Sequence, residues 1–344
     1  MDSKVGFEDG LAKDVVSSGL CVGCGACLAV CPCGCLAWAY GKPELRGECR
    51  SCGLCVKVCP KSCSSFSEVE FHVFGRGRTG LEVFGIHRGV YRVRSREDRV
   101  LKICQDGGAV TSLLLHALEA KLIDGAVLSG VSAEKPLFPV SRLAMSAEDV
   151  LSCAGSRYTC SPNLFGLTEA VKRGLGKVAF VGTPCQVQAL RLMQMASAKL
   201  AKCVTLLLGL MCSECFQYEG LVSVLSGLGI NLDEVEKVNI KGSMVVNLKS
   251  GVSREVSLSS VKKHALRGCE NCGDFASELA DLSLGGLGME GWTGVVVRTK
   301  VGEDLLGSAK SAGLVDVENL GEDERPFRLL VRLSTMKRQF RVCL

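Results

Sequence analysis

The run Cys21-Val-Gly-Cys24-Gly-Ala-Cys27-Leu-Ala-Val-Cys31-Pro32 has the same spacing as Cys49-Arg-Ser-Cys52-Gly-Leu-Cys55-Val-Lys-Val-Cys59-Pro60. In each run three cysteines stand two residues apart, and a fourth cysteine precedes a proline. Three cysteines at such intervals wrap a tight loop around one face of a four-iron cluster, whereas the fourth points away and closes a second cluster. Two complete copies in tandem rarely arise by chance.

This pattern is typical of bacterial-type ferredoxin modules that carry two 4Fe–4S clusters. A disulfide scaffold and a zinc site are the alternatives, but zinc sites lack the paired C-x3-C-P ends. The sequence therefore predicts two iron–sulfur sites. We expect the first on Cys21, Cys24, Cys27 and Cys59, and the second on Cys49, Cys52, Cys55 and Cys31.

Length and composition exclude several classes of protein. The chain has 344 residues, of which 47% are hydrophobic and 40 are glycine, so it can bury a sizeable core. A net charge of +5 without a Lys/Arg block gives no indication of nucleic-acid binding. The 21 cysteines follow an N-terminus with no apolar signal run, which predicts a cytoplasmic, reducing location. The longest apolar run, residues 204–212, is too short to span a bilayer and reads as a buried strand.

Several stretches around the cysteine runs have patterns of their own. Residues 1–20 are predicted to be an amphipathic lead-in with a helix over residues 11–16. Residues 36–43 read as a hairpin between the two runs, and residues 62–70 as a polar linker. Three further cysteines exceed the eight ligands and are expected to be small buried thiols: Cys33, Cys35 and Cys63, the last also able to replace a neighbouring ligand.

Beyond the linker, strand and helix patterns alternate. This alternation predicts an α/β domain with a largely parallel sheet. C-terminal helices and a basic tail are expected after the last strand. The expected strands are residues 83–86, 90–95, 126–131, 177–181, 204–210 and 295–297; the expected helices are 113–122 and 187–195; residues 244–248 and 252–258 form a hairpin.

Two glycine-rich motifs suggest different roles. The dinucleotide-binding fingerprint G-x-G-x-x-G is matched by the residues Gly286-Leu-Gly288-Met-Glu-Gly291. A helix should follow this fingerprint, but the segment that follows is strand-like, so we expect a turn here. Gly107-Gly108 precedes a predicted helix, whose free N–H groups and positive end favour a phosphate. An ordinary capped helix is the equally weighted alternative for that position.

Four more cysteines follow strands or lie in loops, and together they are candidates for a third 4Fe–4S cluster: Cys185, Cys212, Cys269 and Cys272. A zinc site, a Cys269–Cys272 redox dithiol and unrelated buried thiols are the alternatives. Cys215 is close enough in sequence to replace Cys212, and a helix is expected to begin at Phe216. His116 lies on an apolar helix and is expected to be a satisfied core residue. The other cysteines are expected to be packing residues: Cys104, Cys153, Cys160, Cys203 and Cys343.

Five segments, in this order, resemble one family. They are Asp106-Gly-Gly-Ala-Val-Thr, Gly155-Ser-Arg-Tyr158, Gly182-Thr-Pro-Cys-Gln186, Leu210-Met-Cys212 and Cys269-x-x-Cys272-x-Asp274-Phe. The chain is similar, from about residue 83 to 298, to the beta subunits of coenzyme F420-reducing hydrogenases and F420-linked dehydrogenases. With its N-terminal cysteine module it most resembles the electron-input subunit of F420H2 dehydrogenases. It departs from the family pattern at Cys215, usually not a cysteine, and at Arg157, where lysine is common.

The resemblance implies a two-cluster ferredoxin module over residues 1–66 and an α/β flavin-binding domain with halves at 67–200 and 201–344. It implies FAD, three 4Fe–4S clusters, coenzyme F420 as substrate, and an F420-dependent oxidoreductase in which no side chain need act as nucleophile. Partners would be other subunits of a redox complex of the membrane dehydrogenase, hydrogenase or heterodisulfide reductase type, which allows a peripheral place on a membrane complex. The anionic tail of the deazaflavin would meet Arg88, Arg92 and Arg94. The residues implied to hold FAD are Gly107, Gly108, Thr111, Ser156, Arg157, Tyr158, Ser161 and Thr183.

Two other functions are compatible with the same sequence. One is a flavin-free adaptor that relays electrons between the clusters of a larger complex. The other is a ferredoxin-dependent reductase that acts on a different small molecule. A yellow chromophore released on denaturation separates the flavoprotein from the adaptor.

Overall fold

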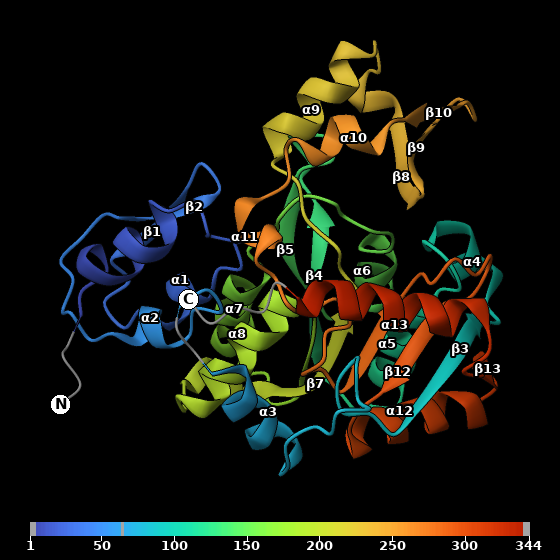
Figure 1. The fold of residues 1–344 in the computed structure, drawn as a ribbon, viewed down its shortest axis with the longest axis horizontal. Helices are drawn as coiled ribbons and strands as arrows, with labels where there is room; N and C mark the ends of the chain where they lie inside the picture. The colour runs from blue at the N-terminus through green and yellow to red at the C-terminus, as the bar shows by residue number, and fades with distance from the viewer. Residues whose placement is uncertain (1–4, 63–64, 340–344) are drawn as a thin grey trace.

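A computed structural model describes residues 5–62 and 65–339. Three parts of the chain are distinct in Figure 1: a cysteine-rich N-terminal module at the left, a central sheet covered by helices, and a smaller lobe at the top. The predicted basic tail and two of the predicted thiols, Cys63 and Cys343, fall wholly or partly outside the described residues. None of the helices in these ranges is long and apolar enough to cross a membrane.

The N-terminal module is small and has its own apolar core. The predicted hairpin is confirmed, with a turn at Tyr40 and Gly41, and the predicted lead-in helix is a π-helix. Phe7, Leu11 and Leu28 are buried together at the centre of the module. Its elements are η1 (Glu8–Val16), α1 (Ala26–Val30), β1 (Leu36–Ala39), β2 (Lys42–Leu45) and α2 (Leu54–Lys57).

The linker prediction is wrong for residues 66–70, which begin helix α3 (Phe66–Phe74). The Ser65 side chain caps the helix by accepting from the N–H of Glu68. Val69 and Glu70 are buried, and the Glu70 carboxylate pairs with Arg78. The polar residues of this stretch therefore form a helix cap and a buried ion pair. The partner in that ion pair, Arg78, lies outside the stretch and cannot be recognised from it.

The central sheet has eight strands in the order β13-β3-β12-β11-β7-β6-β4-β5. The expectation of a largely parallel sheet holds only for the middle, where β4, β6, β7 and β11 are parallel neighbours; the pairs outside them are antiparallel. Short connections without a crossover helix join β4 to β5 and β11 to β12, which makes those pairs antiparallel. The bounds are β3 (Gly89–Ser95), β4 (Gly125–Val131), β5 (Pro139–Ala144), β6 (Val178–Gly182), β7 (Val204–Leu210), β11 (Leu282–Gly285), β12 (Thr293–Val297) and β13 (Val315–Asn319).

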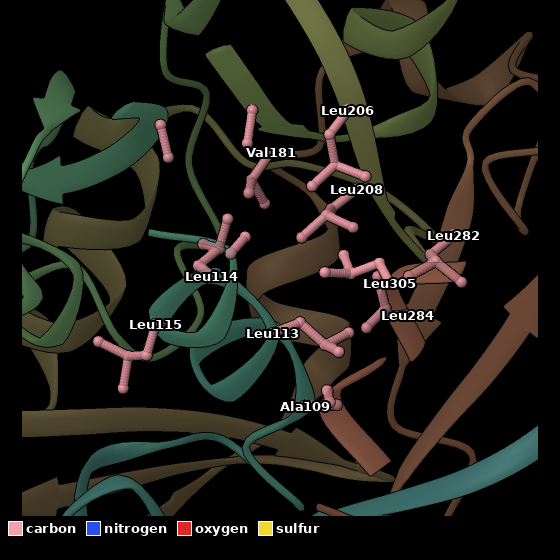
Figure 2. Packing of buried hydrophobic residues seen from close by; sticks show 14 of the residues in the cluster. Ala109, Leu113, Leu114, Leu115, Val181, Leu206, Leu208, Leu282, Leu284 and Leu305 are labelled. Carbon is pink, nitrogen blue, oxygen red and sulfur yellow. The ribbon is translucent and has the colours of Figure 1, made fainter. Parts of the chain in front are cut away.

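Helices cover both faces of this sheet, so the strands are buried on both sides and read as continuous apolar runs. On one face α5 (Ala109–Glu119) and α12 (Lys300–Ser311) pack against alternate strand residues. Figure 2 shows Leu113 of α5 and Leu305 of α12 beside Leu208 of β7. On the other face lie α8 (Pro184–Met195), α7 (Leu167–Lys172) and α13 (Arg325–Arg338).

The module and the central domain share one hydrophobic cluster. Val22, Ala29 and Val58 of the module are buried with Leu164 and Leu190 of the central domain. The Leu164 N–H donates to the Cys24 carbonyl at 3.2 Å. The module is therefore packed onto the α8 side of the sheet, as Figure 1 also shows.

The third part is a lobe inserted between Cys215 and Cys269. Its predicted hairpin is confirmed, and α9 begins at Tyr218, two residues later than expected. Phe216 instead forms isolated bridges with Thr159 and Ala265 at the base of the lobe. The elements are α9 (Tyr218–Gly227), η4 (Leu232–Glu234), β8 (Val235–Lys241), β9 (Ser243–Leu248), β10 (Ser253–Val256) and α10 (Leu258–Lys262).

Residues 83–86 are not the strand that their alternation predicts. Gly85 has a φ of 88°, and the carbonyl groups of Phe84 and Ile86 accept from the guanidinium of Arg298. A buried arginine thus replaces a strand partner. The predicted helices are present, but α5 and α8 begin earlier, at Ala109 and Pro184. The remaining elements are α4 (Asp98–Ile103), α6 (Ala147–Ser152), η2 (Asn163–Gly166), η3 (Lys199–Cys203) and α11 (Arg267–Glu270).

Candidate redox site

The carboxyl ends of the parallel strands converge on one edge of the sheet, which is where open α/β sheets bind ligands. Thr183 and Cys185 follow β6, and Cys212 follows β7. The amino-terminal end of α5 reaches the same edge, because α5 runs back from it before β4 begins. Most of the predicted cofactor residues lie at this edge.

The inner cysteines line one cavity. It is bounded by Cys185, Cys212, Cys215, Cys269 and Cys272, together with Val22 of the N-terminal module. Cys185 lies in the first turn of α8, and Cys269 and Cys272 come from α11 and the turn after it. The structure thus brings together the four predicted inner thiols, and it places Cys215 among them as a fifth.

The pKa of Cys212 is raised first by a hydrogen bond with the Cys215 side chain and then by burial. Burial raises the pKa of the Cys185 thiol, and the neighbouring Cys272 thiol adds to the effect. Burial likewise raises the pKa of Cys269 to about 11. Thiols of this kind bind metal as thiolates, so occupation of the site would release protons.

The first predicted cluster site is also assembled. Burial raises the pKa of the Cys24 thiol, with further increments from Cys59 and Cys27. The pKa of Cys27 is raised in the same way by burial and then by Cys21 and Cys59. Cys21 and Cys59 also pack against the buried apolar cluster that contains Cys27, so these thiols are close neighbours.

The second predicted set lines a separate cavity of the module. Cys31, Cys49, Cys52 and Cys55 bound it together with Cys33 and Cys35. Cys52 is exposed at its outer side. Burial raises the pKa of Cys55 to about 11, and the adjacent Cys52 and Cys49 thiols contribute.

The donor chemistry of all three sets of thiols suits an iron–sulfur cluster. Thiolate sulfur is the ligand of such clusters, and each thiolate binds a different iron. A zinc site would instead place its ligands around one ion. Within residues 5–62 and 65–339, no three His, Cys, Asp or Glu side chains are spaced for a single metal ion.

Cys160, expected to be a packing residue, lies between the first site and the inner cavity. Its thiol bonds to the Val22 carbonyl, and a Cβ on Gly23 would lie 2.8 Å from its sulfur. Burial raises its pKa, and the next contributions come from Cys185 of the inner cavity and Cys24 of the first site. The two sites are therefore neighbours, separated by Cys160 and Val22.

His116 is the satisfied core residue that the sequence predicts, since it is buried and its Nε2 lies 2.7 Å from Ser308 Oγ. The Gly286–Gly291 segment is the predicted turn, because it joins antiparallel β11 and β12. Cys104 and Cys203 are buried, as expected of packing residues, whereas Cys153 is half-buried.

The predicted FAD residues fall into two connected groups. At the start of α5, Gly108 has a φ of 75°, and a Cβ on Gly107 would lie 2.4 Å from the Val93 carbonyl oxygen. Thr111 is buried in the first turn. Gln105, two residues before Gly107, donates to the Tyr158 hydroxyl at 3.4 Å and so links this helix start to the loop after α6.

The second group continues from that loop to β6. Gln186 joins its ends, because its Nε2 donates to the Ser161 carbonyl at 2.6 Å and its Oε1 accepts from the Thr183 N–H at 3.0 Å. Thr183 Oγ1 lies 3.3 Å from Cys185 Sγ. Thr183 thus connects the predicted flavin residues to Cys185 of the inner cysteine cavity, whereas Ser156 is exposed.

Three buried polar atoms beside the predicted flavin residues have no hydrogen-bond partner within the part of the chain that the structure describes: Gln105 Oε1, Arg157 Nε and Thr159 Oγ1. The Arg157 guanidinium donates to the Ala154 carbonyl at 3.2 Å, and burial lowers its pKa. Such atoms are costly to bury without a partner; Arg157 Nε and Thr159 Oγ1 could donate to the anionic groups of FAD, and Gln105 Oε1 could accept from one of its donors.

Two lobe residues that sequence reasoning missed also face this region. Asn239 Oδ1 accepts from Gln105 Nε2 at 2.5 Å, and Lys237 Nζ donates to the Cys104 carbonyl. Both lie on β8, far from the motifs in sequence, so only the fold shows their place. Of the arginines predicted to meet an anionic tail, Arg88 pairs with Glu303 and Arg92 with Glu318 and Glu324. Arg94 donates to the Gly291 carbonyl at 3.1 Å.

Comparison with known proteins assigns the family. Two family models of the coenzyme F420 hydrogenase/dehydrogenase beta subunit match the chain, the N-terminal one over residues 90–167 and the C-terminal one over residues 175–323. A chain of the xenon-derivatised F420-reducing [NiFe] hydrogenase complex from Methanosarcina barkeri has a similar structure. The TM-score is 0.72 at 34% identity, covering 76% of this chain and 92% of the other.

Three relatives illustrate how far the similarity extends. The beta subunit of the coenzyme F420 hydrogenase of Methanococcus voltae is 34% identical over 74% of this chain and 93% of its own length. The coenzyme F420-dependent sulfite reductase of Methanocaldococcus jannaschii is 34% identical over 90% of this chain and 49% of its own. One of the subunits of the F(420)H(2) dehydrogenase of Methanosarcina mazei is 29% identical over 95% of this chain and 91% of its own.

The alignment with the dehydrogenase covers 95% of this chain, so it includes most of the cysteine-rich module. The others support the central domain and its mixed sheet. These relatives are named as subunits or members of F420-related redox enzymes. The chain belongs to the coenzyme F420 hydrogenase/dehydrogenase beta subunit family.

Proposed function

We propose that this chain is an iron–sulfur flavoprotein that oxidises reduced coenzyme F420, or reduces F420 in reverse, by hydride exchange with FAD. Electrons would pass singly through three 4Fe–4S clusters to other subunits of a redox complex. Family membership supports the F420-related redox role. The FAD, the three clusters and their ligands are the finer parts of the proposal.

One observation carries it: the predicted flavin residues, the inner thiols and the first module site form a continuous series. Thr183, at the flavin side, is 3.3 Å from Cys185 through its hydroxyl. Cys185 lines the inner cavity, as does Val22 from the first module loop. Bound FAD would supply the conversion between two-electron and one-electron chemistry. The protein supports this by keeping the three regions adjacent.

The packing also suggests an order for the module sites. The first set abuts the inner cavity through Cys160, whereas the second set has Cys52 exposed at its outer side. We therefore assign Cys21, Cys24, Cys27 and Cys59 to the proximal cluster. The second set would be distal and would face another protein of the redox complex.

Charge near the lobe supports an anionic substrate tail. Arg94, Arg157 and Lys237 donate to backbone carbonyl groups, whereas Arg88 and Arg92 pair with glutamates. Partly buried cations of this kind can form charge-assisted hydrogen bonds with an anionic ligand. The tail of the deazaflavin would lie between β8 of the lobe and the start of α5.

The experiment uses the full chain, reconstituted anaerobically with iron, sulfide and FAD. Reduced F420 and an artificial viologen acceptor are added, and the return of the F420 absorbance is followed. We expect turnover and a yellow flavin released on denaturation. A fully loaded protein that holds flavin but does not oxidise reduced F420 contradicts the substrate assignment. A loaded protein without flavin supports the adaptor role instead.

Arg157→Met is the matched test of the flavin residues, with Arg142→Met as its control, because Arg142 is the exposed residue of edge strand β5. Loss of the Arg157 guanidinium removes a hydrogen-bonded cation from the predicted pocket. We expect flavin affinity to fall about tenfold or more, as for the loss of one charged hydrogen bond. Equal flavin retention in both variants would place the flavin elsewhere.

A further inference from the structure

The second module site holds more thiols than one cluster uses. Its cavity is bounded by six cysteines, whereas a 4Fe–4S cluster takes four. Three of them, Cys49, Cys52 and Cys55, come from one tight loop. The fourth position therefore has to be filled from Cys31, Cys33 and Cys35.

Two of these three thiols are in direct contact. Cys31 Sγ lies 3.4 Å from Cys35 Sγ. A tight turn between them brings the two thiols together. In this turn Gly34 has a φ of 59°, and its N–H donates to the Cys31 carbonyl at 3.2 Å. Positive φ is easily adopted only by glycine, so this turn is built into the sequence.

The position of Cys35 is fixed from the other side as well. Its carbonyl accepts from the Arg46 N–H at 2.8 Å, at the end of the β1–β2 hairpin. Its side chain is 6% exposed, whereas that of Cys31 is half-buried. Cys35 is thus held in place beside a predicted ligand and inside the same cavity.

We propose that Cys35 is an exchange ligand of the distal cluster, sharing the fourth position with Cys31. The inference rests on the proposed cluster in this site. In the exchange, the Cys35 thiol loses a proton and forms a bond to iron, while the iron bond to Cys31 breaks and that sulfur takes up a proton. No electron is gained or lost, so the step requires no oxidant or reductant.

The two forms differ in how the cluster meets solvent. With Cys31 the fourth ligand is the more accessible sulfur, and with Cys35 it is a buried one. Solvent exposure of the ligands is one of the factors that set the potential of a cluster. The exchange would give the distal cluster, from which electrons leave for the partner protein, two forms that differ in the fourth ligand. The Cys49–Cys52–Cys55 loop would not have to move.

The test uses Cys31→Ala, Cys35→Ala and the double variant in the full, anaerobically reconstituted chain. Cys33→Ala is the matched control, because Cys33 lines the same cavity, whereas it is the Cys35 sulfur that lies 3.4 Å from the Cys31 sulfur. Iron per chain and the EPR spectrum are measured. We expect all three single variants to keep the iron content of the wild type, and the double variant to lose iron or to show a three-iron signal.

Loss of the cluster in Cys31→Ala alone would overturn the proposal, and so would its loss in Cys35→Ala alone. A wild-type protein with no cluster in this site would instead contradict the proposed function. Retention of the first-site cluster and of the circular dichroism spectrum shows that each variant is folded. If the double variant keeps a four-iron cluster, the fourth ligand is another residue and the proposal fails.

Discussion

The backbone N–H of Cys215 donates to the sulfur of Cys269 at 3.4 Å across the inner cavity. A hydrogen bond to a ligand sulfur stabilises the reduced cluster and is one of the factors that set its potential. The Cys215 carbonyl in turn accepts from the Leu266 N–H at 2.9 Å. Cys215 is therefore fixed by its backbone whether or not its thiol binds iron.

The competition between Cys212 and Cys215 gives the first prediction. Cys212 follows β7, and its N–H donates to the Phe275 carbonyl at 2.9 Å, which holds it at the sheet edge. We expect Cys212→Ser to lose the inner cluster and to cut electron exit while leaving FAD bound and reducible. Cys215→Ser should keep all the iron and most of the activity, because the backbone bond to Cys269 remains. EPR cluster counts on both variants check this.

The opposite result would assign the inner-cluster ligand to Cys215 in place of Cys212. If Cys215→Ser loses the inner cluster and Cys212→Ser keeps it, then Cys215 is the ligand. Loss in both would leave the choice between the two thiols unresolved, because a destabilised site sheds its cluster whichever thiol is the ligand. The iron content of the two module sites serves as an internal control, since neither variant lies in the module.

The iron content of the wild type is the second prediction. Three 4Fe–4S clusters correspond to about twelve irons per chain. The structure supports this number by placing the predicted cysteines around three separate cavities or clusters of thiols. About eight irons in a fully loaded sample would remove the inner cluster. Zinc found in its place would make that site structural.

The sequence predicts which module thiols lie together because their spacing is local, while their binding of clusters stays a prediction. The three loop cysteines of each run lie within one turn of chain, so the cluster loop is encoded in a few residues. The meeting of Cys185, Cys212 and Cys269 was predictable only in part, from the rule that parallel strands end at one edge. The neighbourhood of Cys160 was not predictable, because it depends on how the module docks.

In the central sheet and around the predicted flavin residues, contacts between segments distant in sequence were likewise not predictable. Apolar runs located most strands, but they could not distinguish parallel from antiparallel neighbours at the sheet edges. Residues 83–86 alternate like a strand, yet their carbonyls are taken by Arg298, which is distant in sequence. Asn239 and Lys237 reach the candidate site from the inserted lobe, for which the sequence carries no local signal.

The third prediction concerns the role of the distal site. The module and the central domain share a cluster of buried hydrophobic side chains. Deletion of the module would therefore expose Leu164 and Leu190 of the central domain. A point change is the better test, and Cys49→Ser acts within the distal cavity only. We expect it to spare flavin reduction by reduced F420 and to slow transfer to the partner complex. Cys33→Ser is the control. Loss of flavin reduction in Cys49→Ser would contradict the outward role of the module.

The last prediction concerns Glu278, whose side chain is completely buried. Its carboxylate lies 2.7 Å from Arg78 and 3.4 Å from Arg338. The two arginines come from the segment after α3 and from α13, so one carboxylate joins three parts of the chain. Glu278 also lies between Cys272 and β11, on the segment that positions an inner thiol.

Glu278→Gln keeps the size of the side chain but removes the charge that both arginines face. Breaking a buried ion pair from one side leaves an uncompensated charge and costs about 3 kcal/mol or more. Glu303→Gln is the matched control, because the Arg88–Glu303 pair is exposed on both sides and such pairs contribute at most about 1 kcal/mol. We expect a clear fall in the unfolding temperature, with loss of inner-cluster iron, for Glu278→Gln and little change for Glu303→Gln. Equal unfolding temperatures in the two variants would show that the buried carboxylate does not hold these segments together, and that Arg78 is sufficiently compensated by Glu70 alone.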